Sequence, residues 1–258
     1  MLDTLFDLSA VGQLLCLIIY GCFALGVNFL LLRYLHQRYA QNSKLLPVAP
    51  AFQVLTVLFA LLLGFLATDI WAQKRQAVDA AFKEEIALKR LYALNDPKLD
   101  GANEARVMLG KYQTAVAQRE WGNHFNRIPD PEAAFALDSL RLHSVSLSRN
   151  SAPAFIVSEW VRSVNELEEA RYRRLLIGAD VTDSSQWWVI FVLTFFVFAA
   201  LAACHMDRPP AARLIMTLFM VAVVIILWQL VRHTNPYNGG DIRIPLPQTM
   251  SQTLSSVS

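Results

Sequence analysis

The chain has 258 residues, of which 55% are hydrophobic and 17% are charged, and its mean hydropathy is +0.35. This composition is typical of a membrane protein and excludes a disordered, collagen-like or disulfide-rich secreted chain. The 23 basic and 21 acidic side chains leave a net charge of +2, which gives no electrostatic reason to expect a nucleic-acid partner.

Four apolar segments have, or nearly have, the length of about 20 residues that a bilayer-spanning helix needs. They are residues 11–32, 48–68, 187–204 and 214–231, and none of them contains Asp, Glu, Lys or Arg. We therefore predict an all-α membrane protein with four transmembrane helices that contact the lipid bilayer. No basic region precedes the first segment, so we expect a retained span rather than a cleaved signal peptide.

Charge in the short loops predicts the orientation. Residues 33–47 and 205–213 contain five Arg and Lys side chains but a single acid, Asp207. The positive-inside rule places these loops in the cytoplasm, and therefore places both termini and the long segment 69–186 on the extracytoplasmic side.

The segment 69–186 is highly charged and lacks the alternation of a β-strand, which predicts a helical bundle inserted between the second and third spans. We expect helices over residues 69–94, 103–121, 132–147 and 153–177, the first continuing the second span without a break. Asp79 with Lys83 and Glu85 with Lys89 have the spacing of helical ion pairs. The predicted organisation is thus residues 1–68 (two spans), 69–186 (bundle), 187–231 (two spans) and 232–258 (tail).

Residues with catalytic chemistry form no recognisable pattern. The three cysteines lie in or at the apolar segments, the five histidines are scattered, and phosphate-binding loops or nucleophile motifs are absent from the sequence. Adjacent carboxylates such as Glu84 and Glu85, or Glu168 and Glu169, fit a solvated helix face better than acid–base catalysis. We expect no enzyme activity, no metal and no cofactor.

The second apolar segment carries small and polar residues at spacings of three or four: Gln53, Thr56, Ala60, Gly64 and Ala67. Such a stripe permits close packing between helices, which the residues alone favour. It can instead face a pore, with Phe59 and Leu63 as constrictions that gate by dewetting. The candidate pore-lining residues are Gln53, Thr56, Phe59, Ala60, Leu63 and Gly64. The spans lack the ionisable residues of a proton relay or ion-coupled transporter, but a passive pore needs none.

Two short motifs carry a resemblance to a known family. Leu63, Gly64 and Phe65 end the second apolar run, and an aromatic and charged helix with Asp69, Trp71, Lys74 and Arg75 follows. After the fourth span, Asn235, Pro236 and Tyr237 lead to Asp241. Both motifs, and the order of the elements, resemble the bestrophins and, more closely, the bacterial bestrophin-like domain membrane proteins.

The resemblance implies a homopentamer in a bacterial cytoplasmic (inner) membrane, with five copies of the second span around an axis that passively conducts small anions such as chloride. The alternative is a non-conducting assembly or sensor whose helical domain binds a protein partner. Animal bestrophins carry a calcium-binding acidic cluster where this chain has only Asp241, so we expect no calcium site. True bestrophins keep the helical domain in the cytosol; we follow the charge count, because charge bias sets orientation physically.

Overall fold

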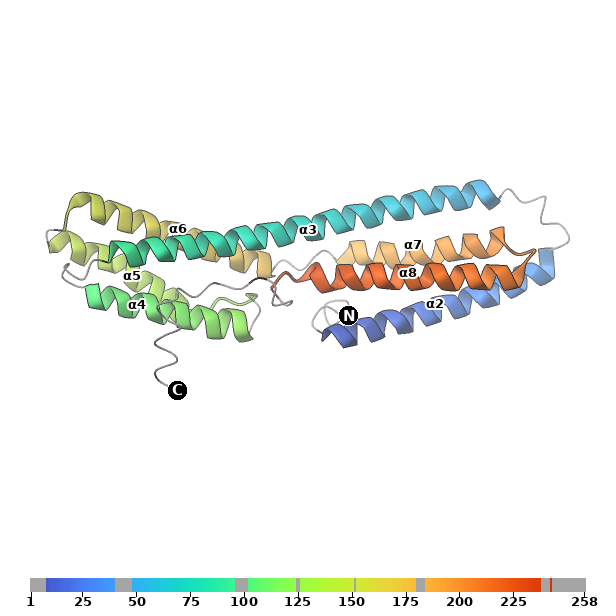
Figure 1. Ribbon diagram of the computed structural model, residues 1–258, viewed down its shortest axis with the longest axis horizontal. Coiled ribbons are helices and arrows are strands. Elements are labelled where there is room, and N and C mark those ends of the chain that lie inside the picture. Colours follow the sequence, from blue (N-terminus) through green and yellow to red (C-terminus); the bar gives the residue numbers. More distant parts are fainter. Residues whose placement is uncertain are drawn as a thin grey trace. The chain divides into compact units, whose positions relative to one another are not determined.

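The computed structural model describes residues 8–39, 48–95, 102–123, 126–150, 152–179, 184–237 and 242. Within these residues every regular element is a helix and no strand is present (Figure 1). The all-α fold class predicted from the sequence is therefore confirmed. The tail beyond residue 242, and Asp241 of the family motif, lie outside the described residues.

The chain divides into two compact units. The membrane unit comprises Met1–Ala72 with Val181–Asn235, and the helical unit comprises Gln73–Asp180 with Pro236–Ser258. One helix, α3 (Val48–Leu94), contributes residues to both units. The sequence-based expectation that the second span continues as a helix to Leu94 is confirmed.

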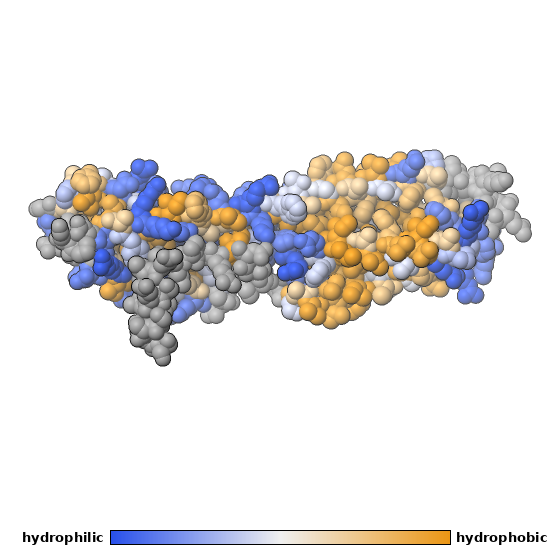
Figure 2. Space-filling view, viewed as in Figure 1, coloured by the Kyte–Doolittle hydropathy of each residue, from blue (hydrophilic) through white to orange (hydrophobic). Residues whose placement is uncertain are grey.

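The membrane unit contains α2 (Ala10–Tyr39), the first part of α3, α7 (Ser184–Cys204) and α8 (Pro209–Thr234). All four helices are long and apolar enough to cross a membrane, as the sequence predicted. Pro209 and Pro210 begin α8, where a missing backbone N–H costs no helical hydrogen bond. Apolar side chains cover much of the visible outer surface of this unit (Figure 2), as expected for helices whose solvent is lipid.

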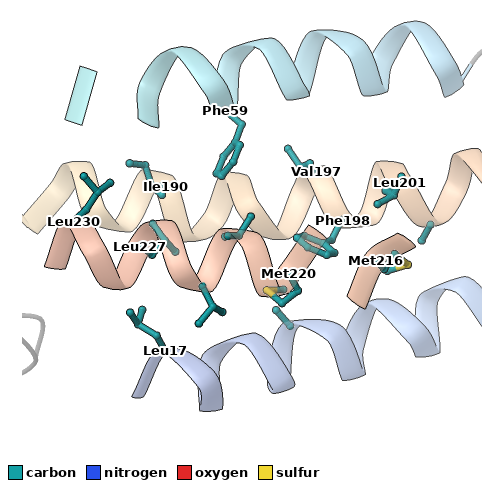
Figure 3. Close-up of a cluster of buried hydrophobic side chains, with 14 of the residues drawn as sticks. Leu17, Phe59, Ile190, Val197, Phe198, Leu201, Met216, Met220, Leu227 and Leu230 are labelled. Carbon is teal, nitrogen blue, oxygen red and sulfur yellow. The ribbon is translucent and has the colours of Figure 1, made fainter. Parts of the chain in front are cut away.

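The core of the membrane unit joins all four helices. Figure 3 shows Phe59 of α3 pointing toward α7 and α8, and Leu17 of α2 lying beside α8. Two polar side chains at this core donate hydrogen bonds locally or across helices: Tyr20 donates to the carbonyl of Phe191 at 2.8 Å, and Asn28 Nδ2 donates to the carbonyl of Ala24 at 2.8 Å. Hydrogen bonds of this kind are needed because a bilayer offers no water to buried polar groups.

The helical unit contains the rest of α3, α4 (Ala102–Ala115), the π-helix η2 (Val116–Asn123), α5 (Pro131–Arg149) and α6 (Ala154–Ala179). Each predicted helix is present, but the one expected over residues 103–121 changes from α to π after Ala115. Helix α5 begins with a capped turn, in which Asp130 accepts hydrogen bonds from the backbone of Glu132 and Ala133 at 2.9 and 3.2 Å.

Both expected ion pairs along α3 are present. Lys83 Nζ lies 2.7 Å from the Asp79 carboxylate, and Lys89 pairs with Glu85. A buried apolar cluster in the same helical unit contains Leu91, Leu109, Leu140 and Leu167, drawn from α3, α4, α5 and α6. The unit is therefore a four-helix arrangement with its own core.

Helix α2 packs closely on α8 at Gly21, where an added Cβ would stand 3.1 Å from Cγ2 of Val224. Gly26, on the same helix, has open space at the Cβ position. We expect Gly21→Leu to destabilise the protein by about 1–3 kcal/mol through overpacking. Gly26→Leu gains the same helix propensity without the clash and should match or exceed wild-type stability. Thermal unfolding in detergent measures both variants, and equal melting temperatures for the two would contradict this packing.

Candidate functional site

Helix α3 keeps one line of residues buried along its length. Phe59, Leu66, Ile70, Ala77 and Glu84 are all at most 5% exposed. Their separations of seven, four, seven and seven residues place them within about 40° of one another on an α-helix, at 100° per residue. One side of α3 is therefore buried both in the membrane span and in the charged segment that follows it.

The opposite side of α3 is a second line, displaced by two residues. Val57, Gly64, Thr68, Arg75 and Phe82 follow the same separations and are all exposed. Only 11% of the apolar window of α3 is buried, against 50% for α7 and 39% for α8. We call this side the exposed face of α3, and it is the part of the membrane helices that the protein itself covers least.

The residues predicted to line a pore divide between these two sides. Gln53, Ala60 and Gly64 are exposed, and the Cβ position of Gly64 meets open space. Phe59 lies instead in the core of the membrane unit, and Leu63 is half-buried against that core. Thr56 is half-buried and donates to the carbonyl of Phe52 at 2.8 Å. The predicted set therefore does not form one surface.

Sequence reasoning missed the large apolar residues of the exposed face. Val57, Leu61 and Phe65 follow one another at intervals of four and are 63%, 50% and 60% exposed. Among them only Phe65 belonged to a motif, because Val and Leu are ordinary residues of any transmembrane helix. Their exposure is a property of the fold, which the apolar run itself does not encode.

A second candidate site lies in the helical unit, around a buried pair of opposite charges. Glu84, which we expected on a solvated face, is fully buried, and so is Arg174 of α6. Arg174 Nε donates to one carboxylate oxygen of Glu84 at 2.6 Å, and Nη2 donates to the other at 3.1 Å. The prediction of a solvated face was therefore wrong for Glu84, and also for Glu85, which is 8% exposed. It is confirmed for Glu168 and Glu169 of α6, which form exposed ion pairs.

Glu120 of the π-helix η2 joins Arg174 to a second arginine. Arg174 Nη2 donates to Glu120 Oε2 at 2.8 Å, and Arg171 Nε donates to Oε1 at 3.2 Å. Two arginines thus face two buried carboxylates, so the cluster is electrically balanced. This charge balance is required, because an unpaired charge that is buried in a protein destabilises the fold by several kcal/mol.

Neutral groups complete the cluster, which we call the ionic network. Tyr112 of α4 donates to Glu84 Oε1 at 2.7 Å, and Asn126 accepts from Arg174 Nη1. Burial and the neighbouring Glu84 raise the pKa of Tyr112 well above its ordinary value, so this phenol stays a donor. Burial by itself lowers the pKa of Arg174, but Glu84, Tyr112 and Glu120 together raise it above its ordinary value. Arg174 therefore keeps its charge.

The backbone around the ionic network is unusual. The π-helix η2 carries Glu120, and Asn126 adopts a left-handed φ of 60°. Helix α6 approaches Asn126 so closely that a Cβ at Gly178 would stand 2.2 Å from its carbonyl oxygen. π-Helices and left-handed residues occur mostly where function or tight constraint maintains them. The ionic network is therefore a specialised part of the fold.

The two family motifs occupy defined places. On α3, Leu63 is half-buried, and Gly64 and Phe65 are exposed. Asn235 caps α8, and Pro236 and Tyr237 are buried. A family model described as the bestrophin-like domain matches residues 18–244. The chain belongs to the bestrophin-like family. No curated protein and no solved structure matches it.

As a bestrophin-like protein with four apolar helices, the chain is a multi-pass membrane protein. Within the described residues, no group of three or more His, Cys, Asp or Glu side chains is placed to hold a metal ion. The two candidate sites in the described part of this bestrophin-like chain are the exposed face of α3 and the buried ionic network.

The ionic network predicts unequal effects for two adjacent arginines. Arg174→Met leaves Glu84 and Glu120 buried without their main partner, and we expect a loss of about 3–5 kcal/mol of folding free energy. Arg173 is the matched control, because its pair with Glu169 is solvent-exposed. Arg173→Met should cost at most about 1 kcal/mol. Denaturant unfolding followed by tryptophan fluorescence measures both free energies. Similar losses from the two substitutions would contradict a major contribution of the ionic network to stability.

Proposed function

We propose that this protein is one subunit of an oligomeric pore that passively conducts small anions such as chloride. Membership of the bestrophin-like family supports this proposal. The observation that carries it is the exposed face of α3, which a single chain leaves uncovered. In the proposed assembly this face lies toward a central axis, with five copies expected from the resemblance to bestrophins.

The chemistry of the exposed face suits a passive anion pore. Val57, Leu61 and Phe65 would form successive apolar rings, the kind of constriction that gates by dewetting. Thr68 and Arg75 follow on the same side, offering a hydroxyl group and a positive charge. Residues 48–68 contain no ionisable side chain, so no group in this stretch is available to couple transport to protons.

Exposed apolar residues on the charged part of α3 support an oligomer. Val78 and Phe82 are 47% and 57% exposed. They lie about 14 and 20 Å beyond Asp69 along the helix, at about 1.5 Å per residue. They are interspersed with Arg75, Asp79 and Lys83, so water is their expected surrounding. Neighbouring copies of the chain would cover them.

Reconstitution tests the pore. Purified wild-type protein in liposomes should pass chloride above a protein-free control, and Leu61→Ala, which widens the proposed constriction, should raise the flux several-fold. Ile19→Ala is the matched control, since Ile19 is 67% exposed on α2, a different membrane helix. A well-folded oligomer that passes no chloride would reject the pore. Equal chloride flux from Leu61→Ala and Ile19→Ala would reject the constriction at α3 but not the pore itself.

We also propose that the helical unit lies outside the cytoplasm of a bacterial inner membrane, on the evidence of the basic short loops. In a cysteine-free background, a membrane-impermeant thiol reagent should label Ser139→Cys of α5 in intact spheroplasts. It should label Arg38→Cys, near the end of α2, only after permeabilisation. The reverse pattern would place the helical unit in the cytosol, as in true bestrophins.

A non-conducting assembly or sensor is the second candidate, and one feature of α5 favours it. Phe135, Leu142 and Val145 share one side of the helix and are 75%, 68% and 48% exposed. An apolar surface on a water-exposed helix often marks a protein contact. The liposome experiment separates the two candidates, because this alternative requires a folded protein that gives no flux.

A further inference from the structure

The segment that follows α8 docks on the helical unit through an aromatic side chain. Tyr237 is 4% exposed, and its ring lies edge-on against Trp121 at 5.2 Å between centroids. Tyr237 also clusters with Ile242 and with Ala77 and Ala81 of α3. The two alanines are small, so they leave room for the tyrosine ring on the buried side of α3.

Trp121 connects this docked tyrosine to the ionic network. Its ring lies 5.9 Å from the guanidinium carbon of Arg174, within the range of a cation–π contact. Trp121 belongs to the π-helix η2 and directly follows Glu120, the carboxylate that bridges the two arginines. Trp121 therefore lies between Tyr237 and the guanidinium group of Arg174 in one series of contacts.

The strength of the ionic network depends on the exclusion of water, because the attraction between charges weakens as the local dielectric constant rises. A residue that covers the network therefore controls how firmly α3, η2 and α6 are held together. Tyr237 is buried beside the network and close in sequence to a membrane helix, since only Asn235 and Pro236 separate it from Thr234, the last residue of α8.

We propose that Tyr237 is a latch: docked on Trp121, it keeps the network of Glu84, Arg174 and Glu120 dry and holds the π-helix in place. Undocking admits water to the network and loosens η2 and the adjoining part of α6. A displacement at the end of α8 reaches Tyr237 through two residues of chain, so the latch makes the ionic network responsive to that helix. This device does not depend on whether the protein conducts.

Hydrogen exchange of the full-length protein in detergent tests the latch. In Tyr237→Ala, amides of residues 116–123 and 171–178 should exchange about tenfold faster or more, as local opening becomes easier. Those of α4 and α5 should keep their wild-type protection. Tyr172→Ala is the matched control, because Tyr172 is a 66% exposed tyrosine beside Arg171 on α6. It should leave both segments unchanged.

A second substitution separates the aromatic contact from the hydroxyl group. Tyr237→Phe keeps the ring on Trp121 and should retain most of the protection. Unchanged exchange in Tyr237→Ala, or a uniform rise throughout the helical unit, would overturn the latch, the latter because it indicates general loss of packing. If Tyr237→Ala does not yield folded protein, Tyr237→Leu replaces it, because leucine keeps the bulk but loses the aromatic contact with Trp121. Unchanged exchange in that variant, or a uniform rise throughout the helical unit, would likewise overturn the latch.

Discussion

Helix α3 has to bury the same side along 47 residues while its surroundings change from apolar to charged. In the membrane unit that side carries Phe59, Leu66 and Ile70, which pack against other apolar helices. In the helical unit it carries Ala77, Ala81 and then Glu84. A carboxylate at this position can be buried only if a cation meets it, and Arg174 does so with two hydrogen bonds. The geometry of α3 therefore determines where α6 must place its arginines.

A buried ion pair contributes little net stability compared with an apolar contact of the same size, but removal of one partner is costly. The ionic network is better understood as a device that allows one arrangement of helices and penalises the others. The π-helix and the left-handed Asn126 fit this role. The π-helix η2 carries Glu120 to Arg174, and Asn126, which follows η2 in the chain, accepts a hydrogen bond from the same arginine. Gly178 lets α6 come close enough to complete the contact.

The sequence predicted what depends on local pattern and missed what depends on distant partners. The four spans, the continuous α3 and the pair of Asp79 with Lys83 follow from runs and spacings within one helix, and all are present. The burial of Glu84 does not follow, because its partner is 90 residues away and a Glu-Glu pair resembles any solvated helix face. Phe59 was assigned to a pore for a similar reason: periodicity groups residues into sides, but only neighbouring helices decide which side is buried.

The exposed face of α3 has different meanings in its two parts. Around Val57 and Leu61 lipid alone could cover it, so exposure there does not by itself require another copy of the chain. Beyond Asp69 the helix carries Arg75, Asp79 and Lys83, and lipid is no longer a fitting neighbour for Val78 and Phe82. A covering surface of protein is then the simpler explanation. Since both parts belong to one side of one continuous helix, an assembly that covers the charged part also determines what Val57 and Leu61 face, which in the proposed pore is the axis.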